Sequence, residues 1–446
     1  MPLELDSQHW GDFWLADAPE RRLPGVLDLS TGRPTVTIRG QLTPWVPARE
    51  ESFTIHGELT VGGLRKVTIL DAFTKSRRTN GIHHPHSTDG MLNGTHEISG
   101  AWTIRGCHVS PGDVIEYASI QFTHLDRWVD DDGLTDLTNH SEEPLILEYR
   151  QPASKSVDIL EGRGTVKTEF QSPILPLVGR EIHMKHRAWL SFTDLKVDSL
   201  SILLESIILP TLSLMTIMVG RKCELTELDV SFKPHGKRSS VHHPTIKPDA
   251  EQPEIDPGFE FLLLSDIGIE SVANWIAKAA DFAPIPNIIY STFGTNDDQA
   301  IESLVLQLAA CAEGFDRRKY GDKKVIPRSR VRRARSIAVK SIEDELGNEI
   351  ANRAREALGQ FDRSTFPERL NRLIRLTEGA LPGITGREAE WIQRVKNARN
   401  GYAHMLDGVG EEWEVSYALF HSLRWMQMDY KQLRQISSRL APTIYP

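Results

Sequence analysis

The sequence has few cysteines. Its 446 residues include three, Cys107, Cys223 and Cys311, which lie far apart in the chain. An odd number of widely spaced cysteines supports neither a disulfide framework nor a four-cysteine zinc site. The chain also lacks an excess of positive charge. Its 52 Lys and Arg residues are outnumbered by 61 Asp and Glu residues, which gives a formal net charge of −9. Unselective binding to nucleic acid or anionic membrane needs such an excess, so any nucleic-acid site must be local.

The sequence also lacks the short motifs of several common enzyme classes. No Walker-type loop, Gly-x-Ser-x-Gly elbow or His-Glu-x-x-His motif occurs, which argues against the usual nucleotide, esterase and metalloprotease classes. The first residues, MPLELDSQHW, carry acids where a secretory signal has basic residues and then an apolar run. We therefore expect a cytoplasmic protein in a reducing compartment.

One apolar segment, residues 199–220, is nearly long enough to cross a bilayer. It contains Glu205, Pro210 and several Ser and Thr residues, and strand-like segments flank it on both sides. We expect a helix and turn packed inside the N-terminal domain, without membrane contact. Contact with a membrane is the alternative.

The first half of the chain is patterned as strands. From about residue 34 to residue 235, apolar and polar residues alternate in short segments such as TVTIRGQL, SFTIHGEL and KVTILDAF. This period of two, with Gly, Pro and Asp between the segments, predicts a sandwich or barrel, and we assign residues 1–234 to a β-rich domain. Residues 233–257 are rich in Pro, His and charge and are predicted as a loop. A strand, a helix and a turn follow, so residues 235–294 are expected to be a linker and connector.

From residue 295 the apolar period changes to steps of three and four, which predicts helices. Thr365 and Glu368 match a capping box that starts one of them, and apolar residues from Trp413 to Leu433 have helical spacing in another. We predict a helical bundle over residues 295–446 and, for the whole chain, an α+β multidomain protein. The first helix of the bundle has an apolar stripe made of Ile301, Leu304, Leu308, Cys311 and Phe315.

The segment KNARNGYAHML, residues 396–406, combines an arginine, an asparagine and a histidine. On a regular helix, positions 399 and 404 lie about 140° apart around the axis. Asn400-Gly401 is a turn signal, however, and a loosened helix there would let Arg399, Asn400 and His404 face one volume. A guanidinium that binds phosphate and an imidazole that moves a proton suit RNA cleavage without a metal. The alternative is a histidine that caps the end of a helix beside an unrelated arginine.

The densest basic tract, KKVIPRSRVRRAR, covers residues 323–335. It could hold RNA phosphates, although a solvated helix face paired with Glu343, Asp344 and Glu345 fits equally well. No RNA-recognition signature with interleaved aromatic residues occurs, so base-specific binding is not expected. The basic residues are Lys323, Lys324, Arg328, Arg330, Arg332, Arg333 and Arg335.

The segment GIHHPHSTDG gathers His83, His84 and His86, and Asp89 could complete a metal site. Proline and glycine make this segment a loop, and no second cluster has matching spacing. We therefore expect no metal site and no cofactor.

Two segments resemble a known family. ARNGYAH, residues 398–404, resembles the Arg-x-x-x-x-His motif of HEPN domains, and GDFWLADAPERRLPGVLDLSTGRPTVTIRGQL, residues 11–42, resembles the opening of the ApeA-type N-terminal domain. The resemblance implies a ribonuclease of bacterial defence, in which RNA cleavage halts the growth of a phage-infected cell. It makes tRNA a candidate target and the N-terminal domain a sensor of a phage-derived trigger or a regulator.

The resemblance also assigns roles to residues. It implies that Arg399 and His404 are catalytic, that Asn400 orients the site, and that Glu313 lies near the motif. For Glu313 an ordinary surface ion pair with Arg317 is the alternative. Because HEPN domains generally pair so that two motifs line one site, the resemblance implies a homodimer or a higher assembly. A noncatalytic ligand-binding or interaction protein with a helical dimerisation domain is the competing hypothesis.

Overall fold

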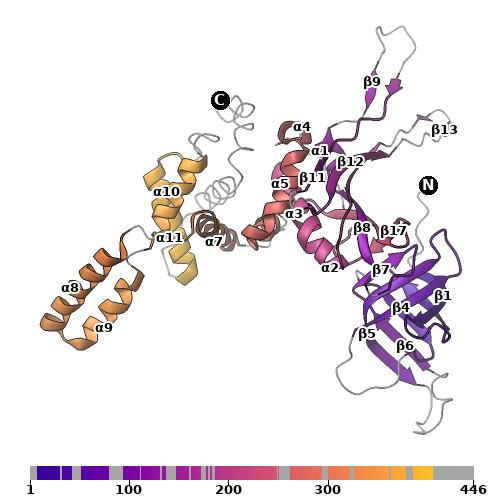
Figure 1. Ribbon diagram of the computed structural model, residues 1–446, viewed down its shortest axis with the longest axis horizontal. Helices are drawn as coiled ribbons and strands as arrows, with labels where there is room; N and C mark the ends of the chain where they lie inside the picture. Colours follow the sequence, from indigo (N-terminus) through magenta and orange to yellow (C-terminus); the bar gives the residue numbers. More distant parts are fainter. Residues whose placement is uncertain are drawn as a thin grey trace. The chain divides into compact units, whose positions relative to one another are not determined.

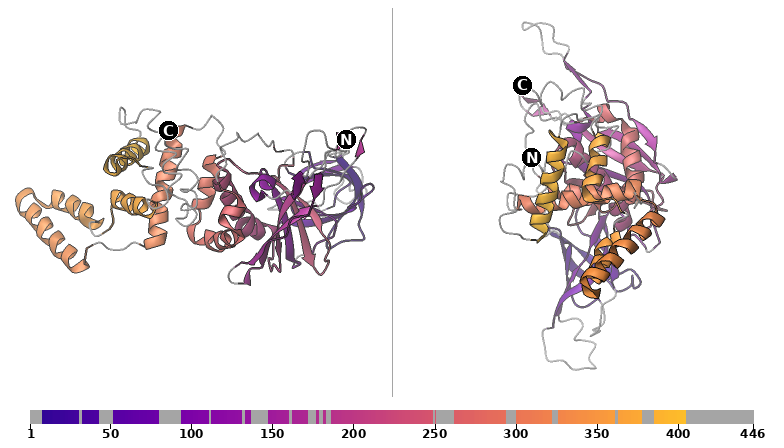
Figure 2. Two further views of the ribbon diagram at one scale, coloured as in Figure 1. Left: turned by 90° about the horizontal axis from the view of Figure 1, so that it is seen from above. Right: turned by 90° about the vertical axis from the view of Figure 1, so that its left-hand side faces the viewer.

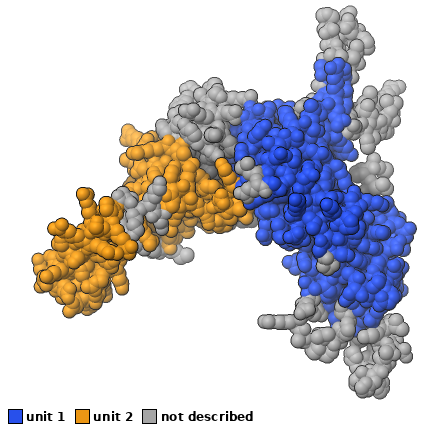
Figure 3. Space-filling view, viewed as in Figure 1, with its two compact units in different colours: residues 1–219, 223–277 blue, residues 220–222, 278–446 orange. Residues whose placement is uncertain are grey.

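The computed structural model places the chain in two compact units (Figure 3). Unit 1 comprises residues 1–219 and 223–277, and unit 2 comprises residues 220–222 and 278–446. The three-part division predicted from the sequence stays a prediction. The structure describes residues 8–404 except 31–32, 43–51, 80–93, 111, 131–132, 137–146, 160–161, 172–176, 179–180, 183–185, 249, 251–261, 294–299, 322–325, 361–362 and 378–384.

Unit 1 begins with a closed barrel of antiparallel strands (Figure 1). The strands pair in the order β4-β1-β2-β3-β6, and β5 pairs with both β4 and β6, which closes the ring. This closure removes the free edges except along Val67–Leu70 of β5, which pair with β7. The barrel agrees with the alternating pattern of the sequence. The strands are β1 (Gln8–Leu15), β2 (Leu23–Asp28), β3 (Thr35–Arg39), β4 (Phe53–Leu59), β5 (Lys66–Thr79) and β6 (Gly94–Ser99).

The barrel interior is filled by apolar side chains that alternate along its strands. Phe13, Leu27, Ile38 and Ile55 are fully buried there, and each buried side chain of this size stabilises the fold by roughly 1.5–3 kcal/mol. Gly57 is required by the packing, because a Cβ atom at this position would lie 2.6 Å from the ring of Phe13. The register of the barrel is therefore set by its core.

Further strands of unit 1 extend the same sheet from β5. Their order is β7-β17-β16-β8-β15-β12-β11, with β7 paired to β5. β17 lies where the sequence predicts a loop, and that prediction is wrong for these residues because they complete the ladder between β16 and β7. The strands are β7 (Trp102–Arg105), β8 (Val114–Phe122), β11 (Ser156–Asp158), β12 (Thr165–Gln171), β15 (Arg187–Thr193), β16 (Leu225–Lys233) and β17 (Ser239–His242).

Unit 1 also holds smaller elements outside this sheet. The short helix α1 packs against β15. Two two-stranded ribbons pair β9 with β10 and β13 with β14. These elements are α1 (Leu125–Val129), β9 (Leu134–Asp136), β10 (Leu147–Tyr149), β13 (Leu177–Val178) and β14 (Glu181–Ile182).

The apolar segment forms a helix inside unit 1, as α2 (Leu200–Leu203), η3 (Leu204–Ile208) and α3 (Leu209–Val219). With a mean hydropathy of 2.0 over its most apolar 18 residues, the helix is long and apolar enough to cross a membrane. However, 72% of this 18-residue stretch is buried within the protein. Trp275 donates its indole N–H to the carbonyl of Pro210 at 2.9 Å. The same carbonyl also accepts from the hydroxyl of Ser213 at 2.7 Å, so the indole is anchored to the part of the helix, Pro210–Val219, whose residues are all buried.

Two helices lie at the C-terminal end of unit 1. The sequence predicts a strand ahead of the first, but Leu264–Ile267 form helix α4, with Asp266 accepting the N–H of Leu263 at 2.9 Å. Helix α5 (Ile269–Ala279) follows after Gly268. The strand prediction is therefore wrong where the structure describes the segment, because a side-chain cap starts a helix there.

Unit 2 is helical. α7 packs against α6, α10 and α11, whereas α8 and α9 pack on each other as a hairpin (Figure 2). The predicted capping box is confirmed, because the N–H of Thr365 donates to Glu368 at 2.7 Å and the N–H of Glu368 donates to Thr365 at 3.4 Å. The helix predicted around Trp413–Leu433 lies outside the described residues. The elements are η4 (Ala280–Phe282), α6 (Ile285–Phe293), α7 (Ile301–Tyr320), α8 (Arg328–Leu346), α9 (Asn348–Ala357), η5 (Leu358–Gln360), α10 (Phe366–Thr377) and α11 (Glu388–His404).

Candidate active site

Helix α11 carries the motif and runs without a break from Glu388 to His404. The predicted loosening at Asn400-Gly401 is therefore wrong. Ala398 and Gly401 are both buried in the helix, so tertiary packing overrides the local turn preference of the Asn-Gly pair. On this continuous helix, positions 399 and 404 stay about 140° apart around the axis.

The guanidinium of Arg399 has three neighbours. Its Nη1 donates to Asn400 Oδ1 at 3.2 Å, and its Nη2 lies 3.5 Å from Glu313 Oε2. Its Cζ lies 5.3 Å from the centre of the Phe366 ring. The structure thus brings together Arg399, Asn400 and Glu313, as the sequence predicts, and adds Phe366. The prediction that His404 shares their cleft concerns its side chain, which lies outside the described part of the structure.

Glu313 on α7 has both contacts that the sequence suggested. Its Oε1 accepts from Arg317 at 2.6 Å, one turn further along the helix, and its Oε2 faces Arg399 at 3.5 Å. The shorter contact is to Arg317, so Arg399 is held loosely by the carboxylate. The side chain of Arg399 keeps 40% of its surface exposed, which leaves donors available for an anionic ligand.

A buried ionic cluster beside this site was not predicted. Asp316 is 0% exposed and binds two arginines of α10. Arg372 donates Nε to Oδ1 at 2.8 Å and Nη2 to Oδ2 at 2.6 Å, and Arg369 donates Nη1 to Oδ2 at 3.1 Å. The bond to Asp316 raises the pKa of Arg372. One sequence signal was available, because Asp316 lies eight residues after Leu308, on the apolar stripe of its helix.

The predicted basic tract lies mainly on α8. Lys323 and Lys324 fall outside the described residues. Among the described side chains, none of the tract arginines forms an ion pair with Glu343, Asp344 or Glu345, although their exposure fits a solvated helix face. RNA binding by the tract stays a prediction. Four of the arginines, Arg328, Arg330, Arg332 and Arg333, are exposed, and the half-buried Arg335 donates to the carbonyl of Arg355 at 2.6 Å.

The predicted absence of a metal site is not tested at the histidine cluster. His83, His84, His86 and Asp89 all lie outside the described residues. In the described part of the chain, no group of three or more His, Cys, Asp or Glu side chains is placed to hold a metal.

The cysteines are free thiols and all are buried. Burial raises the pKa of Cys223 and of Cys311 to about 12, and the pKa of Cys107 is also raised, mainly by burial. A thiol must ionise to act as a nucleophile. Burial therefore disfavours the thiolate form of these cysteines and a nucleophilic role for them.

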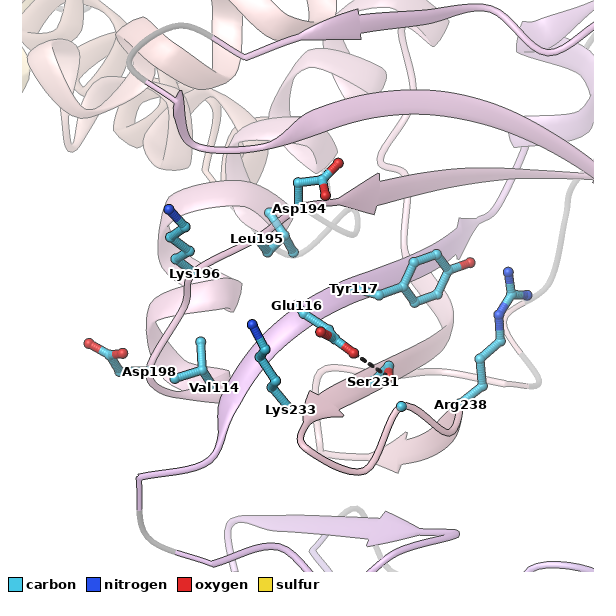
Figure 4. A pocket seen from close by; sticks show the side chains of 11 residues that line it. Val114, Glu116, Tyr117, Asp194, Leu195, Lys196, Asp198, Ser231, Lys233 and Arg238 are labelled. Carbon is cyan, nitrogen blue, oxygen red and sulfur yellow. Dashed lines mark hydrogen bonds between the residues drawn. The ribbon is translucent and has the colours of Figure 1, made fainter.

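A cavity of about 730 Å³ lies in unit 1, over β8, β16 and the segment that follows β15 (Figure 4). Arg238 at its wall lies over the ring of Tyr117 at 4.6 Å and pairs with Glu169 at 3.1 Å. No residue of the Arg399 site lines this cavity. Its charges balance, because Lys196, Lys233 and Arg238 are matched by Glu116, Asp194 and Asp198.

Comparison with known protein families gives two matches. Residues 8–275, more than half of the chain, match ApeA N-terminal domain 1, and residues 306–420, which include Arg399–His404, match the Apea-like HEPN domain. HEPN domains are generally ribonucleases. A comparison with curated proteins and one with solved structures found no match. The chain therefore belongs to the ApeA family, with a β-rich ApeA N-terminal domain followed by a helical HEPN domain.

Proposed function

We propose that this protein is a metal-independent endoribonuclease that acts in abortive-infection defence against phage, with RNA, and tRNA in particular, as its substrate. The observation that carries the proposal is the guanidinium of Arg399, held by Glu313, Asn400 and Phe366 inside a domain of HEPN type. The N-terminal domain is proposed as the sensor or regulator, and the protein as cytoplasmic.

The proposed reaction is an internal transfer of a phosphoryl group. The ribose 2′-hydroxyl loses its proton to a base and attacks the adjacent phosphorus, while the 5′-oxygen of the next nucleotide leaves and takes up a proton. The products are a 2′,3′-cyclic phosphate and a 5′-hydroxyl end. Arg399 stabilises the charge on the phosphorane oxygens, and His404 moves the proton.

A second copy of the chain completes the proposed site. Because α11 is continuous, positions 399 and 404 point to different sides of one helix. Pairing of two copies would bring Arg399 of one chain toward His404 of the other. We therefore propose a homodimer with composite sites.

The exposed arginines of α8 are proposed to hold the RNA backbone. Arg328, Arg330, Arg332 and Arg333 have no ion-pair partner among the described side chains, so phosphates would not have to displace a carboxylate. Contacts of this kind neutralise phosphates and release counterions, which makes the affinity fall as salt rises.

The first experiment compares RNA cleavage by the wild-type protein and by the variants Arg399→Ala and His404→Ala, with tRNA in EDTA. Loss of a general acid–base group typically costs 10²–10⁴-fold in rate, and we expect each variant to lose at least about 100-fold. Arg394→Ala is the control, because Arg394 lies on the same helix and pairs with Glu390 at 2.9 Å. The control should cleave at the wild-type rate. Equal cleavage by all four proteins, or no cleavage by the wild type with phage extract added, would refute the proposal.

The competing function is a noncatalytic ligand-binding protein, favoured by the cavity of about 730 Å³ in unit 1. It predicts that cells carrying His404→Ala resist phage as well as cells carrying the wild type. Substitution in the cavity, such as Lys233→Ala, would then abolish resistance. The nuclease hypothesis requires that His404→Ala loses resistance.

A further inference from the structure

Two carboxylates on one turn of α7 reach two different helices. Glu313 and Asp316 are three residues apart, so they lie on the same face of the helix. Glu313 contacts Arg399 on α11, whereas Asp316 binds Arg369 and Arg372 on α10. The distance from Glu313 to Arg399 is 3.5 Å and this pair is partly exposed, whereas Asp316 lies 2.6 Å from Arg372 and 3.1 Å from Arg369 and is buried. The stronger of these two ionic attachments of α7 is therefore to α10.

Helix α10 brings an aromatic ring to the same guanidinium. Phe366 is its first residue and lies three positions before Arg369, one turn away from the buried cluster. The cluster also reaches back toward the ring, because Arg372 donates Nη1 to Ser364 Oγ at 3.2 Å. The capping box at Thr365 then fixes the residue next to Phe366. The position of the ring is thus set by Asp316 through α10.

We propose that Phe366 and Asp316 are positioning residues for Arg399. The ring supports the guanidinium through its π-face, and the ionic cluster of Asp316 holds the helix that carries the ring. Glu313, whose nearer partner is Arg317, contacts the guanidinium only at 3.5 Å, so the ring adds support that the carboxylate does not supply. A donor fork held in this way meets a phosphate without first losing rotamer freedom. The catalytic part of this inference rests on the proposed function.

The contact between ring and guanidinium can be tested without any activity. We would measure thermal unfolding of the full chain for Phe366→Leu, Arg399→Gln and the double variant. Because the single substitutions remove the same contact, the fall in Tm of the double variant should be smaller than the sum of the two single falls. Phe366→Leu combined with Arg394→Gln is the matched control and should be additive. Additive behaviour in both pairs would overturn the inference.

The role in cleavage is tested by separating kcat from KM. Phe366→Leu should lower kcat by about tenfold or more and change KM by less than about twofold, because orientation acts in the transition state. Phe366→Tyr, which keeps the ring, should recover most of the rate. The control is Phe315→Leu, which removes an aromatic ring of the same unit that stacks on Phe282 at 5.1 Å. This variant should be less stable but keep its kcat.

The buried cluster is tested in the same assay. Asp316→Asn should lower kcat, and where this variant does not fold, Arg372→Gln replaces it, because that side chain is 33% exposed. If the wild type cleaves RNA and Phe366→Leu has an unchanged kcat, the positioning role is refuted but the nuclease proposal is not. If the wild type does not cleave RNA but the Tm changes of Phe366→Leu and Arg399→Gln are non-additive, the nuclease proposal is refuted but the contact is not.

Discussion

At the scale of single residues, the environment of a side chain decides its chemistry more than its type does. Three buried cysteines have raised pKa values, whereas Arg399 keeps part of its surface open. The role of Arg399 was inferred from a short motif and that of Glu313 from the family resemblance, and the structure places the two side chains in contact. Phe366 was not inferred, because its distance of 33 residues from Arg399 in the chain gives no local signal.

Two half-buried histidines of unit 1, His242 and His243, should make its stability depend on pH. Burial lowers the pKa of His242 and of His243 to about 4, while an unfolded histidine titrates near its ordinary value. Between these two values the unfolded chain binds more protons than the folded chain, so stability rises with pH. We expect stability to increase from about pH 4 to about pH 6.5 and then to level off.

The measurement is the free energy of unfolding in urea, followed by tryptophan fluorescence, at a series of pH values across this range. His242→Gln should flatten the rise, because it removes one titrating group. His235→Gln is the control, since His235 is partly exposed and lies 3.2 Å from Asp113. A slope that is unchanged in His242→Gln would contradict the assignment.

At the scale of elements, period and capping were better guides than the Asn-Gly turn signal. The change from a period of two to steps of three and four separated the strand-rich part from the helical part, and the capping box placed the start of α10. The Asn400-Gly401 signal failed, because burial of Gly401 keeps α11 intact. β17 was missed because its partners β16 and β7 supply the pairing that its own polar sequence does not indicate.

The packing of α7 against α10 should depend on the carboxylate of Asp316. Asp316→Ala would leave Arg369, which is 2% exposed, without its buried counter-charge. Removing one partner of a buried pair costs about 3–5 kcal/mol, and we expect a loss of this size in chemical denaturation of the full chain. Glu349→Ala removes the exposed pair with Arg353 and should cause no measurable loss. Equal stability of the two variants would contradict the role of Asp316.

At the scale of the whole molecule, the order of a β-rich part and a helical part could be predicted because the two patterns differ over long stretches. The closure of the barrel could not, since it depends on β5 pairing with β4, β6 and β7 at different points along its length. Contacts between such distant segments leave no trace in local periodicity. The assembly of two chains belongs to the same scale and stays a prediction.

Composite sites should allow two inactive chains to complement each other. Mixed dimers of Arg399→Ala and His404→Ala chains contain one site with both groups intact. With random pairing, half of the dimers are mixed, so about a quarter of the wild-type activity should return. The measurement is RNA cleavage after the two variants are unfolded and refolded together. Activity no higher than that of the separate variants would contradict a shared site.

The strand β5 also determines how the N-terminal domain unfolds. It closes the barrel through β4 and β6 and at the same time starts the open sheet through β7. A cut between β6 and β7 would leave a bare row of N–H and C=O groups on β5, which invites aggregation. Barrel and open sheet should therefore melt together in one cooperative transition, and a ligand bound to either would protect both from proteolysis.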